Sequence, residues 1–326
     1  MTRYFLGVDV GNTKCHALIV DETGTAVGFG AGGPGNHEVL GPDGFRDALH
    51  VVVNGALASA VLKPEQIHGA GFGIAGYDWP SDGMLMHQVI DTLGMNAPYQ
   101  FVNDAMIGLI AGAKQGWGVA VSAGTSCNCR GRDQAGKEGR VTGNGQWFGE
   151  YGGGIELVYK AFDAMTREWS LRGPKTLITQ IFVEHYQVNS VLDLLEGIAR
   201  ERLRMRATDA ELVFKAFHQG DAVAENIIRW ISQELAGLAI GVIHQLQIET
   251  LEFEVVLAGS FYKGTPLIEE VMHETIHSVA PSASLVRLNA PPVVGAAMLG
   301  MEQAGIDFTQ YRDHIIETTN RQFYSL

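Results

Sequence analysis

The fold can be inferred outward from one stretch near the N-terminus, Tyr4-Phe5-Leu6-Gly7-Val8-Asp9-Val10-Gly11-Asn12-Thr13-Lys14-Cys15-His16-Ala17-Leu18-Ile19-Val20-Asp21-Glu22-Thr23-Gly24. Apolar runs flank the turn at residues 11–14, and the second run ends at another turn, which predicts strand, tight turn, strand, turn and strand. Gly11 lets backbone amides approach a ligand closely, Thr13 and Lys14 add donors, and Asp9 sets a carboxylate at the strand end. The stretch fits a seat for a phosphate chain and its magnesium, and it also fits an ordinary hairpin whose polar residues serve the turn.

Length and composition describe a well-packed globular protein. The chain has 326 residues, enough for two domains of ordinary size, and its 46% hydrophobic and 18% charged residues argue against disorder. The formal net charge of −13 argues against a nucleic acid or an anionic membrane surface as the main partner. Because no apolar run is long enough to span a bilayer and the N-terminus does not resemble a secretion signal, we expect a cytoplasmic protein.

The chain has three cysteines, Cys15, Cys127 and Cys129, a sparse and odd set that fits a reducing compartment. Cys127 and Cys129 alternate along an expected strand, so they should face the same side. We expect them to be small residues of the core or of a pocket wall, because no further Cys or His cluster supplies the other ligands of a metal site.

Hydrophobic patterning predicts two similar series of elements. The first series has strands at 4–10, 15–20, 25–30, 67–74 and 98–102, and helices at 42–62, 81–93 and 105–112. The second series restarts at residue 116, with strands at 117–122, 127–132, 140–142, 253–258 and 284–288, and helices at 221–246, 265–279 and 292–304. A mostly helical segment at 155–218 interrupts it.

Two hairpin turns occupy equivalent places in the two series. The segment 9–13 matches the segment Ser122-Ala123-Gly124-Thr125-Ser126, which predicts an internal duplication. We therefore expect an α/β protein with domains at 1–114 and 115–326, the second carrying the helical insertion at about 155–218. Small residues in the helix after Asp104 and in the last helix would let these two helices cross between the domains as a hinge.

Polar and glycine-rich loops follow several of the expected strands. They lie at 11–14, 73–76, 103–104, 124–126 and 259–260. Ligands of open α/β sheets collect at strand ends, so these loops are expected to converge on one cleft between the domains. Two hairpin turns that face each other could hold a polyphosphate from both sides, an arrangement suited to phosphoryl transfer.

Five of these segments, in this order, resemble the nucleotide-site motifs of the actin, sugar kinase and heat-shock ATPase superfamily. They are Asp9-Val10-Gly11-Asn12-Thr13, Asn103-Asp104-Ala105, Ser122-Ala123-Gly124-Thr125, Leu257-Ala258-Gly259-Ser260 and Pro292-Val293-Val294-Gly295-Ala296. Gly35-Asn36-His37 and the glycine-rich stretch 143–154 resemble the N-acetylglucosamine kinase branch, grouped with the BadF/BadG/BcrA/BcrD ATPases. The resemblance implies two duplicated ribonuclease H-like (actin-like ATPase) domains around an interdomain cleft.

The resemblance also implies how ATP and Mg²⁺ would be bound. Asp9 would hold the magnesium, and Gly11, Asn12, Thr13 and Lys14 would contact the phosphates. From the second domain, Gly124, Thr125 and Ser126 would meet the phosphates, and Gly259 with Ser260 would leave room for the adenosine.

Asp104 would be the general base of an ATP-dependent hexosamine kinase, taking the proton from the 6-hydroxyl of N-acetylglucosamine or glucosamine. A carboxylate at a strand end followed by a helix start is both fixed and accessible, as this role requires. The alternative is that Asp104 is only the N-cap of the helix.

Several polar residues are expected to bind the sugar in this reading. They are Asn36, His37, Gly76, Asn103, Asn128, Asn144 and Glu150, together with Asp104. Trp147 and Phe148 could stack on an apolar sugar face, although their hydrophobicity favours a place in the core.

One segment departs from the branch. Where acetylhexosamine kinases read Asp-Glu-Gly-Ser after Gly149, this chain has Glu150-Tyr151-Gly152-Gly153. A longer carboxylate at Glu150 could favour the ammonium group of glucosamine over the N-acetyl group.

Two other functions remain open at this point. One is a BadF-type ATPase that activates a partner enzyme by electron transfer through an iron–sulfur cluster, although the spacing of Cys127 and Cys129 does not resemble its ligands. The other is a sugar sensor without turnover, against which the presence of both Asp9 and Asp104 argues. We also expect a homodimer.

Overall fold

Two five-stranded sheets with the same strand order form the framework of the protein, for which a computed structural model describes residues 2–324. The first sheet has the order β3-β2-β1-β4-β5 and the second β8-β7-β6-β9-β10. In each sheet the first three strands of the series pair antiparallel and the last two join in parallel. This repeated order confirms the duplicated α/β fold expected from the sequence.

The strands of the first sheet are β1 (Tyr4–Val10), β2 (Cys15–Asp21), β3 (Ala26–Gly32), β4 (Ile67–Ile74) and β5 (Tyr99–Asn103). Those of the second are β6 (Gly118–Ala123), β7 (Cys127–Arg132), β8 (Glu138–Arg140), β9 (Phe253–Ala258) and β10 (Ala283–Arg287). The first half also contains α1 (His37–Ala60), α2 (Gly83–Ile90) and α3 (Asp104–Gly112). The remaining helices are α4 (Gly154–Trp169), α5 (Leu177–His185), α6 (Val191–Ala199), α7 (Ala210–His218), α8 (Ala222–Leu246), α9 (Leu267–His277), α10 (Pro292–Gln303) and α11 (Arg312–Thr319).

The register of the strands brings the polar loops to one edge of each sheet. In the first sheet Val10 is level with Ile74, and Ile74 with Asn103, so the loops after β1, β4 and β5 start side by side. In the second sheet Ser122 is level with Asn128 and Ala258. Because parallel strands end at the same edge, the predicted functional loops must gather there.

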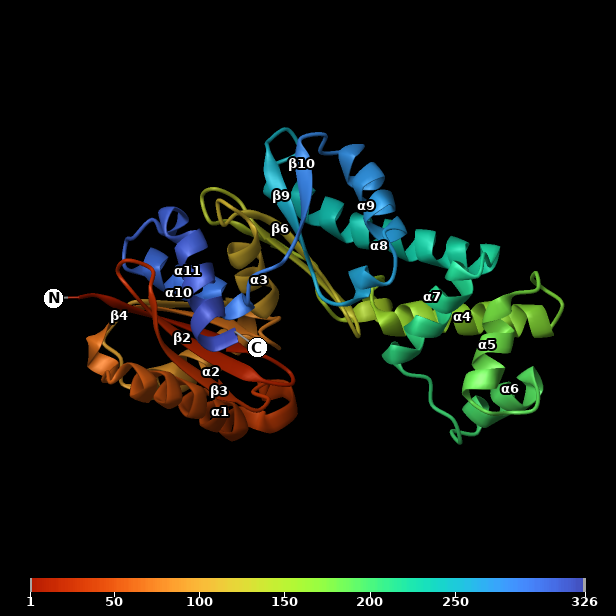
Figure 1. Ribbon diagram of the computed structural model, residues 1–326, viewed down its shortest axis with the longest axis horizontal. Coiled ribbons are helices and arrows are strands. Elements are labelled where there is room, and N and C mark those ends of the chain that lie inside the picture. The colour runs from red at the N-terminus through yellow and green to blue at the C-terminus, as the bar shows by residue number, and fades with distance from the viewer. Residues whose placement is uncertain (1, 325–326) are drawn as a thin grey trace.

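Helix α10 comes late in the chain but packs on the first sheet, beside α3 (Figure 1). A Cβ atom on Gly7 of β1 would lie 2.1 Å from the backbone N of Ala297. A Cβ atom on Gly295 would lie 2.0 Å from the carbonyl oxygen of Ile107 in α3, so glycine is required at both contacts. The two small-residue helices therefore meet as predicted, whereas a hinge motion and the domain boundary at residues 114 and 115 stay predictions.

Helices α4, α5, α6 and α7 occupy the segment expected to be a helical insertion, and they extend away from the first sheet (Figure 1). Helix α8 covers the second sheet, and its N-cap is the predicted Asp221, whose side chain accepts a hydrogen bond from the backbone N of Ala224. Among residues 2–324 no helix has the length and apolar character needed to cross a membrane.

Most boundaries lie within three residues of the predicted ones, and the largest differences are one helix start and one unpredicted helix. Helix α1 begins at His37, because the Asn36 side chain caps it by accepting from the backbone N of Glu38, and the predicted start at Pro42 directly follows a kink at Gly41 (φ 71°). Strand β8 ends at Arg140, where the strand predicted at 140–142 was expected to begin. Helix α11, which packs near β3 and α10, was not predicted.

Candidate active site

A cavity of about 490 Å³ lies where the strand-end loops of the two halves meet. The predicted residues that line it are Asn12, Asn36, Gly76, Asn103, Asp104, Thr125, Ser126 and Asn128. Glu38 and Asp78 line it as well, although nothing in the sequence singled them out. The structure thus brings most of the predicted sugar-binding residues and the proposed base together.

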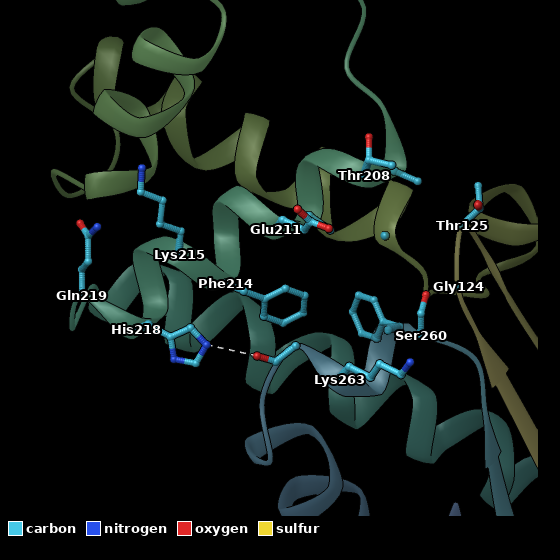
Figure 2. Close-up of a pocket in the computed structure, with 15 residues that line it drawn as sticks. Gly124, Thr125, Thr208, Glu211, Phe214, Lys215, His218, Gln219, Ser260 and Lys263 are labelled. Atoms are coloured by element: carbon cyan, nitrogen blue, oxygen red, sulfur yellow. Dashed lines mark hydrogen bonds between the residues drawn. The ribbon is translucent and has the colours of Figure 1, made fainter. Parts of the chain in front are cut away.

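A second cavity of about 700 Å³ adjoins the first, and Thr125 contributes to both. Figure 2 shows Gly124, Thr125 and Ser260 at one end of it and Lys215, His218 and Gln219 at the other. The rings of Phe214 and Phe261 meet at 5.6 Å between centroids. A predominantly apolar pocket with polar groups at its mouth suits a flat aromatic base such as adenine.

The turn after β1 is tight enough to need glycine. The backbone N of Gly11 donates to the carbonyl oxygen of Lys14 (3.1 Å), and a Cβ atom on Gly11 would lie 2.7 Å from the same oxygen. The side chains of Thr13 and Lys14 are exposed at this turn. Asp9 precedes it and is level with Gly73 of β4; it is not among the described residues that line either cavity, but it lies close enough to Asp104 for that charge to raise its pKa.

The equivalent turn after β6 is fixed by the start of α4. The backbone N of Gly154 donates to the carbonyl oxygen of Gly124 (2.8 Å), and that of Ile155 to Thr125 (3.1 Å). Gly259 approaches the same turn with a φ of 105°, and a Cβ atom there would lie 2.1 Å from the carbonyl oxygen of Ala123. Only glycine fits this position, because any side chain here would collide with the backbone of the turn.

Asp104 is the first residue of α3, but it is not the N-cap. The cap is Asn103, whose side-chain oxygen accepts from the backbone N of Ala105 at 3.0 Å. An Asp104 carboxylate oxygen also lies 3.0 Å from this donor. Since Asn103 caps the helix, the alternative that Asp104 is the N-cap is wrong, and its carboxylate lines the cavity.

The carboxyl groups of Asp9 and Asp104 are difficult to ionise. Burial, with a smaller contribution from the nearby charge of Asp104, raises the pKa of Asp9 to about 7. Burial likewise raises the pKa of Asp104 to about 6, with a further contribution from Asp78. A nearby divalent cation would favour the ionised form of both groups.

A polar network that the sequence analysis missed connects the two halves beside Asp104. Arg130 of β7 donates from Nη2 to Oδ1 of Asp78 at 2.5 Å, and the side chain of Arg130 is only 3% exposed. Asn103 donates to the same carboxylate oxygen at 3.1 Å. Arg140 donates to the backbone oxygen of Asp78. The spacing of these residues in the sequence offers no signal, because the contacts arise only when the sheets meet.

The predicted sugar-binding residues divide into those that line the smaller cavity and those that do not; the contacts of the first group are as follows. Asn36 donates to the Asn12 side chain (2.8 Å), and Gly76 needs its φ of 85° because a Cβ atom would lie 2.5 Å from Oδ1 of Asn36. Asn128 donates to Asn103 (3.3 Å), whereas its buried Oδ1 has no partner among the described residues. An unpaired buried acceptor at a cavity wall is typical of a site that a ligand hydroxyl completes.

His37, Asn144 and Glu150 are not among the described residues that line either cavity. The Glu150 carboxylate accepts hydrogen bonds from the backbone N of Thr142 (2.6 Å) and of Asn144 (3.0 Å), so it holds the loop that follows β8. His37 packs its ring against Phe45, 6.1 Å between centroids. Their proposed contacts with the sugar stay predictions.

Two further residue pairs can be placed. Trp147 is 90% and Phe148 56% exposed, so the expectation that they belong to the core is wrong: they lie on a short 3₁₀ turn, Gly145–Phe148, that faces solvent. Cys127 and Cys129 are buried in the core of the second half, as expected. Burial raises the pKa of the Cys127 thiol to about 12 and that of Cys129 further, which disfavours the thiolates that metals require.

Two sheets of identical order, with glycine turns facing a shared cleft, define the actin-like ATPase fold that sugar kinases share. The chain belongs to the BadF/BadG/BcrA/BcrD ATPase family, whose sequence profile matches residues 6–300.

Relatives of known name are distant in sequence but similar in length. The chain is 27% identical to an N-acetyl-D-glucosamine kinase of Dictyostelium discoideum, over 91% of this chain and 97% of the relative. It is 23% identical to an N-acetylmuramic acid/N-acetylglucosamine kinase of Clostridium acetobutylicum, over 92% and 99%.

Solved structures confirm the fold. A candidate N-acetylglucosamine kinase from Chromobacterium violaceum aligns with a TM-score of 0.64 at 18% identity, over 91% of this chain and 98% of that one. A ROK family glucokinase from Streptomyces griseus, in complex with glucose and AMPPNP, aligns with a TM-score of 0.54 at 20% identity, over 92% and 99%.

The raised pKa of Asp9 leads to a prediction about stability. A carboxyl group whose pKa is higher in the folded state favours folding at low pH, and this contribution is lost as the pH rises from about 4 through 7. We expect Asp9→Asn to raise the free energy of unfolding of the ligand-free protein by about 1 to 3 kcal/mol at pH 8. Urea denaturation would measure this gain, which should shrink at pH 5. A loss of stability at pH 8 would contradict the burial of an ionised Asp9.

Proposed function

We propose that this protein is an ATP-dependent hexosamine kinase that transfers the γ-phosphate of ATP to the 6-hydroxyl of N-acetylglucosamine or glucosamine. The observation that carries the proposal is the position of the Asp104 carboxylate in a cavity between the two glycine turns. The names of the two relatives, which both align over nine-tenths of the chain, support this class of reaction.

In this reaction Asp104 accepts the proton of the sugar hydroxyl as the hydroxyl oxygen attacks the γ-phosphorus, and the β–γ bridging oxygen departs with ADP. The donors of the turn at 11–14 and the turn at 124–126 hold the phosphates from opposite sides. The larger cavity, which Phe214 lines, binds the adenine. Asn36, Asn103 and Asn128 orient the sugar by hydrogen bonds, so the hydroxyl meets the phosphate in line.

Asp9 is the residue proposed to hold Mg²⁺. Asp9 suits this role because burial and the charge of Asp104 raise its pKa, so that a divalent cation would stabilise its ionised form. When bound, the cation would neutralise charge on the phosphates. Thr13 and Asn12 supply neutral oxygen atoms at the adjacent turn.

The pKa of Asp104 predicts the acid limb of the pH profile. Burial raises this pKa to about 6, and only the ionised form can accept the proton. We expect kcat/KM to fall tenfold for each pH unit below the pKa of Asp104, which is about 6 in the ligand-free protein and is lowered by a bound cation. Initial rates at saturating ATP and Mg²⁺ would measure this, and an acid limb that is the same in Asp104→Asn as in the wild type would exclude Asp104 as the base.

A panel of acceptors with an ADP-release assay tests the proposed function. The protein is incubated with ATP, Mg²⁺ and glucosamine, N-acetylglucosamine, N-acetylmuramate or glucose. We expect ADP release that depends on a hexosamine. ADP release that is the same with and without sugar would indicate an ATPase of another kind, and binding of sugar without any ADP release would indicate a sensor.

A further inference from the structure

The smaller cavity, of about 490 Å³, is where the sugar acceptor is proposed to bind, and we call it the acceptor cavity. It carries an excess of negative charge. Three carboxylates line it, those of Glu38, Asp78 and Asp104, and none of its described lining residues is a lysine, arginine or histidine. Charges in a partly enclosed cavity act more strongly on a bound ligand than they would in water. The charge of the acceptor must therefore influence its binding.

Two arginines contact Asp78 at this wall, but neither lines the cavity. Arg130 is 3% exposed and is paired with the Asp78 carboxylate, and Arg140 donates to the Asp78 backbone oxygen. Arg130 therefore compensates Asp78 and is not available to a substrate anion. Its burial also prevents it from moving into the cavity without leaving Asp78 unpaired.

Glu38 lines the acceptor cavity and has no cation paired with it among the described residues. It is exposed at the start of α1, and no ion pair involves it among residues 2–324. Its charge raises the pKa of Asp78, although less than burial does, so the two carboxylates lie close enough to interact. The backbone N of Glu38 is fixed by Asn36, a residue of the same cavity.

We propose that Glu38 makes the acceptor cavity selective for a hexosamine with a free ammonium group and unfavourable to a sugar that carries a carboxylate. The proposal rests on the proposed function and specifies its substrate class. An ammonium gains attraction from Glu38, an N-acetyl group gains none, and a lactyl or uronic carboxylate meets only like charge. The expected order of kcat/KM is glucosamine, then N-acetylglucosamine, then N-acetylmuramate.

The test compares Glu38→Gln with the wild type on these three sugars, below the pKa of the glucosamine ammonium. We expect the ratio of kcat/KM for glucosamine to that for N-acetylglucosamine to fall about tenfold, and the relative rate with N-acetylmuramate to rise. Glu38→Asp, which keeps the charge, should retain most of the wild-type ratio. The matched control Glu65→Gln removes an exposed carboxylate outside the cavity and should leave the ratio unchanged.

Equal ratios in the wild type and Glu38→Gln would overturn the proposal, as would a wild-type preference for N-acetylmuramate. Calorimetric titration with the same sugars separates this failure from failure of the kinase itself. If no sugar is phosphorylated but glucosamine binds and Glu38→Gln weakens its binding, the selectivity stands and the proposed reaction fails. If sugars bind with affinities that Glu38→Gln does not change, the selectivity fails whether or not they are phosphorylated.

Discussion

Asp104→Asn is expected to lower kcat about a thousandfold and to leave ATP binding nearly unchanged. A positioned general base contributes about 10² to 10⁴ to the rate, and the amide cannot accept the proton at neutral pH. The amide has the same shape, and the cap of α3 is supplied by Asn103, so the helix should remain intact. Loss of turnover with retained nucleotide affinity would assign Asp104 to the chemical step.

The control for this variant is its stability. Because burial disfavours the ionised form of Asp104, removing the charge should leave the free energy of unfolding the same or slightly higher at pH 8. Steady-state rates, calorimetric binding of a non-hydrolysable ATP analogue and urea denaturation together test the prediction. If Asp104→Asn retained more than a tenth of the wild-type kcat, the assigned base would be wrong.

Arg130→Met is expected to cost about 3 kcal/mol of stability. It leaves the Asp78 carboxylate, which is 17% exposed on its side chain, in the cavity wall without its cation. Removing one partner of a buried pair costs about 3 to 5 kcal/mol, and the partial exposure of Asp78 favours the lower end. Because Asp78 also accepts from Asn103, the cap residue beside Asp104, movement of an unpaired Asp78 should lower kcat as well.

A double-mutant cycle makes this prediction specific. Asp78→Asn with Arg130→Met removes both charges, so it should recover part of the loss, whereas independent effects would add. The matched surface control is Arg46→Met, whose guanidinium is 43% exposed and paired with Asp43 and Asp47, and it should change the stability by less than about 1 kcal/mol. A cost of Arg130→Met no larger than that of the control would show that the pair does not hold the two halves together.

The repeated strand order could be predicted from the sequence because it depends on local signals. Glycine turns after apolar runs located β1 and β6, and the second turn repeats the first. The loops after parallel strands predicted that Gly76 and Asp104 would lie in one cavity, because parallel strands end at a common edge, whereas Asn36 and Asn128 were expected there from the resemblance to the kinase branch.

Other features of the site depend on how the two sheets meet, which no local pattern encodes. Asp78 and Arg130 are separated by 52 residues and pair only across the cleft. Trp147 and Phe148 are hydrophobic yet exposed, so hydrophobicity alone did not predict where they lie. Glu150 binds backbone amides of its own loop, a use of a carboxylate that the comparison of motifs with a kinase branch did not anticipate.

The position of the transferred phosphate is the most direct test of the central claim, that the cleft joins ATP to a sugar hydroxyl. The measurement is phosphorus and proton NMR of a reaction with glucosamine, ATP and Mg²⁺. The predicted result is one phosphate ester on the 6-hydroxyl, formed in equal amount to ADP and absent with Asp104→Asn. Release of inorganic phosphate without any sugar ester, or no consumption of ATP with any hexosamine, would contradict it.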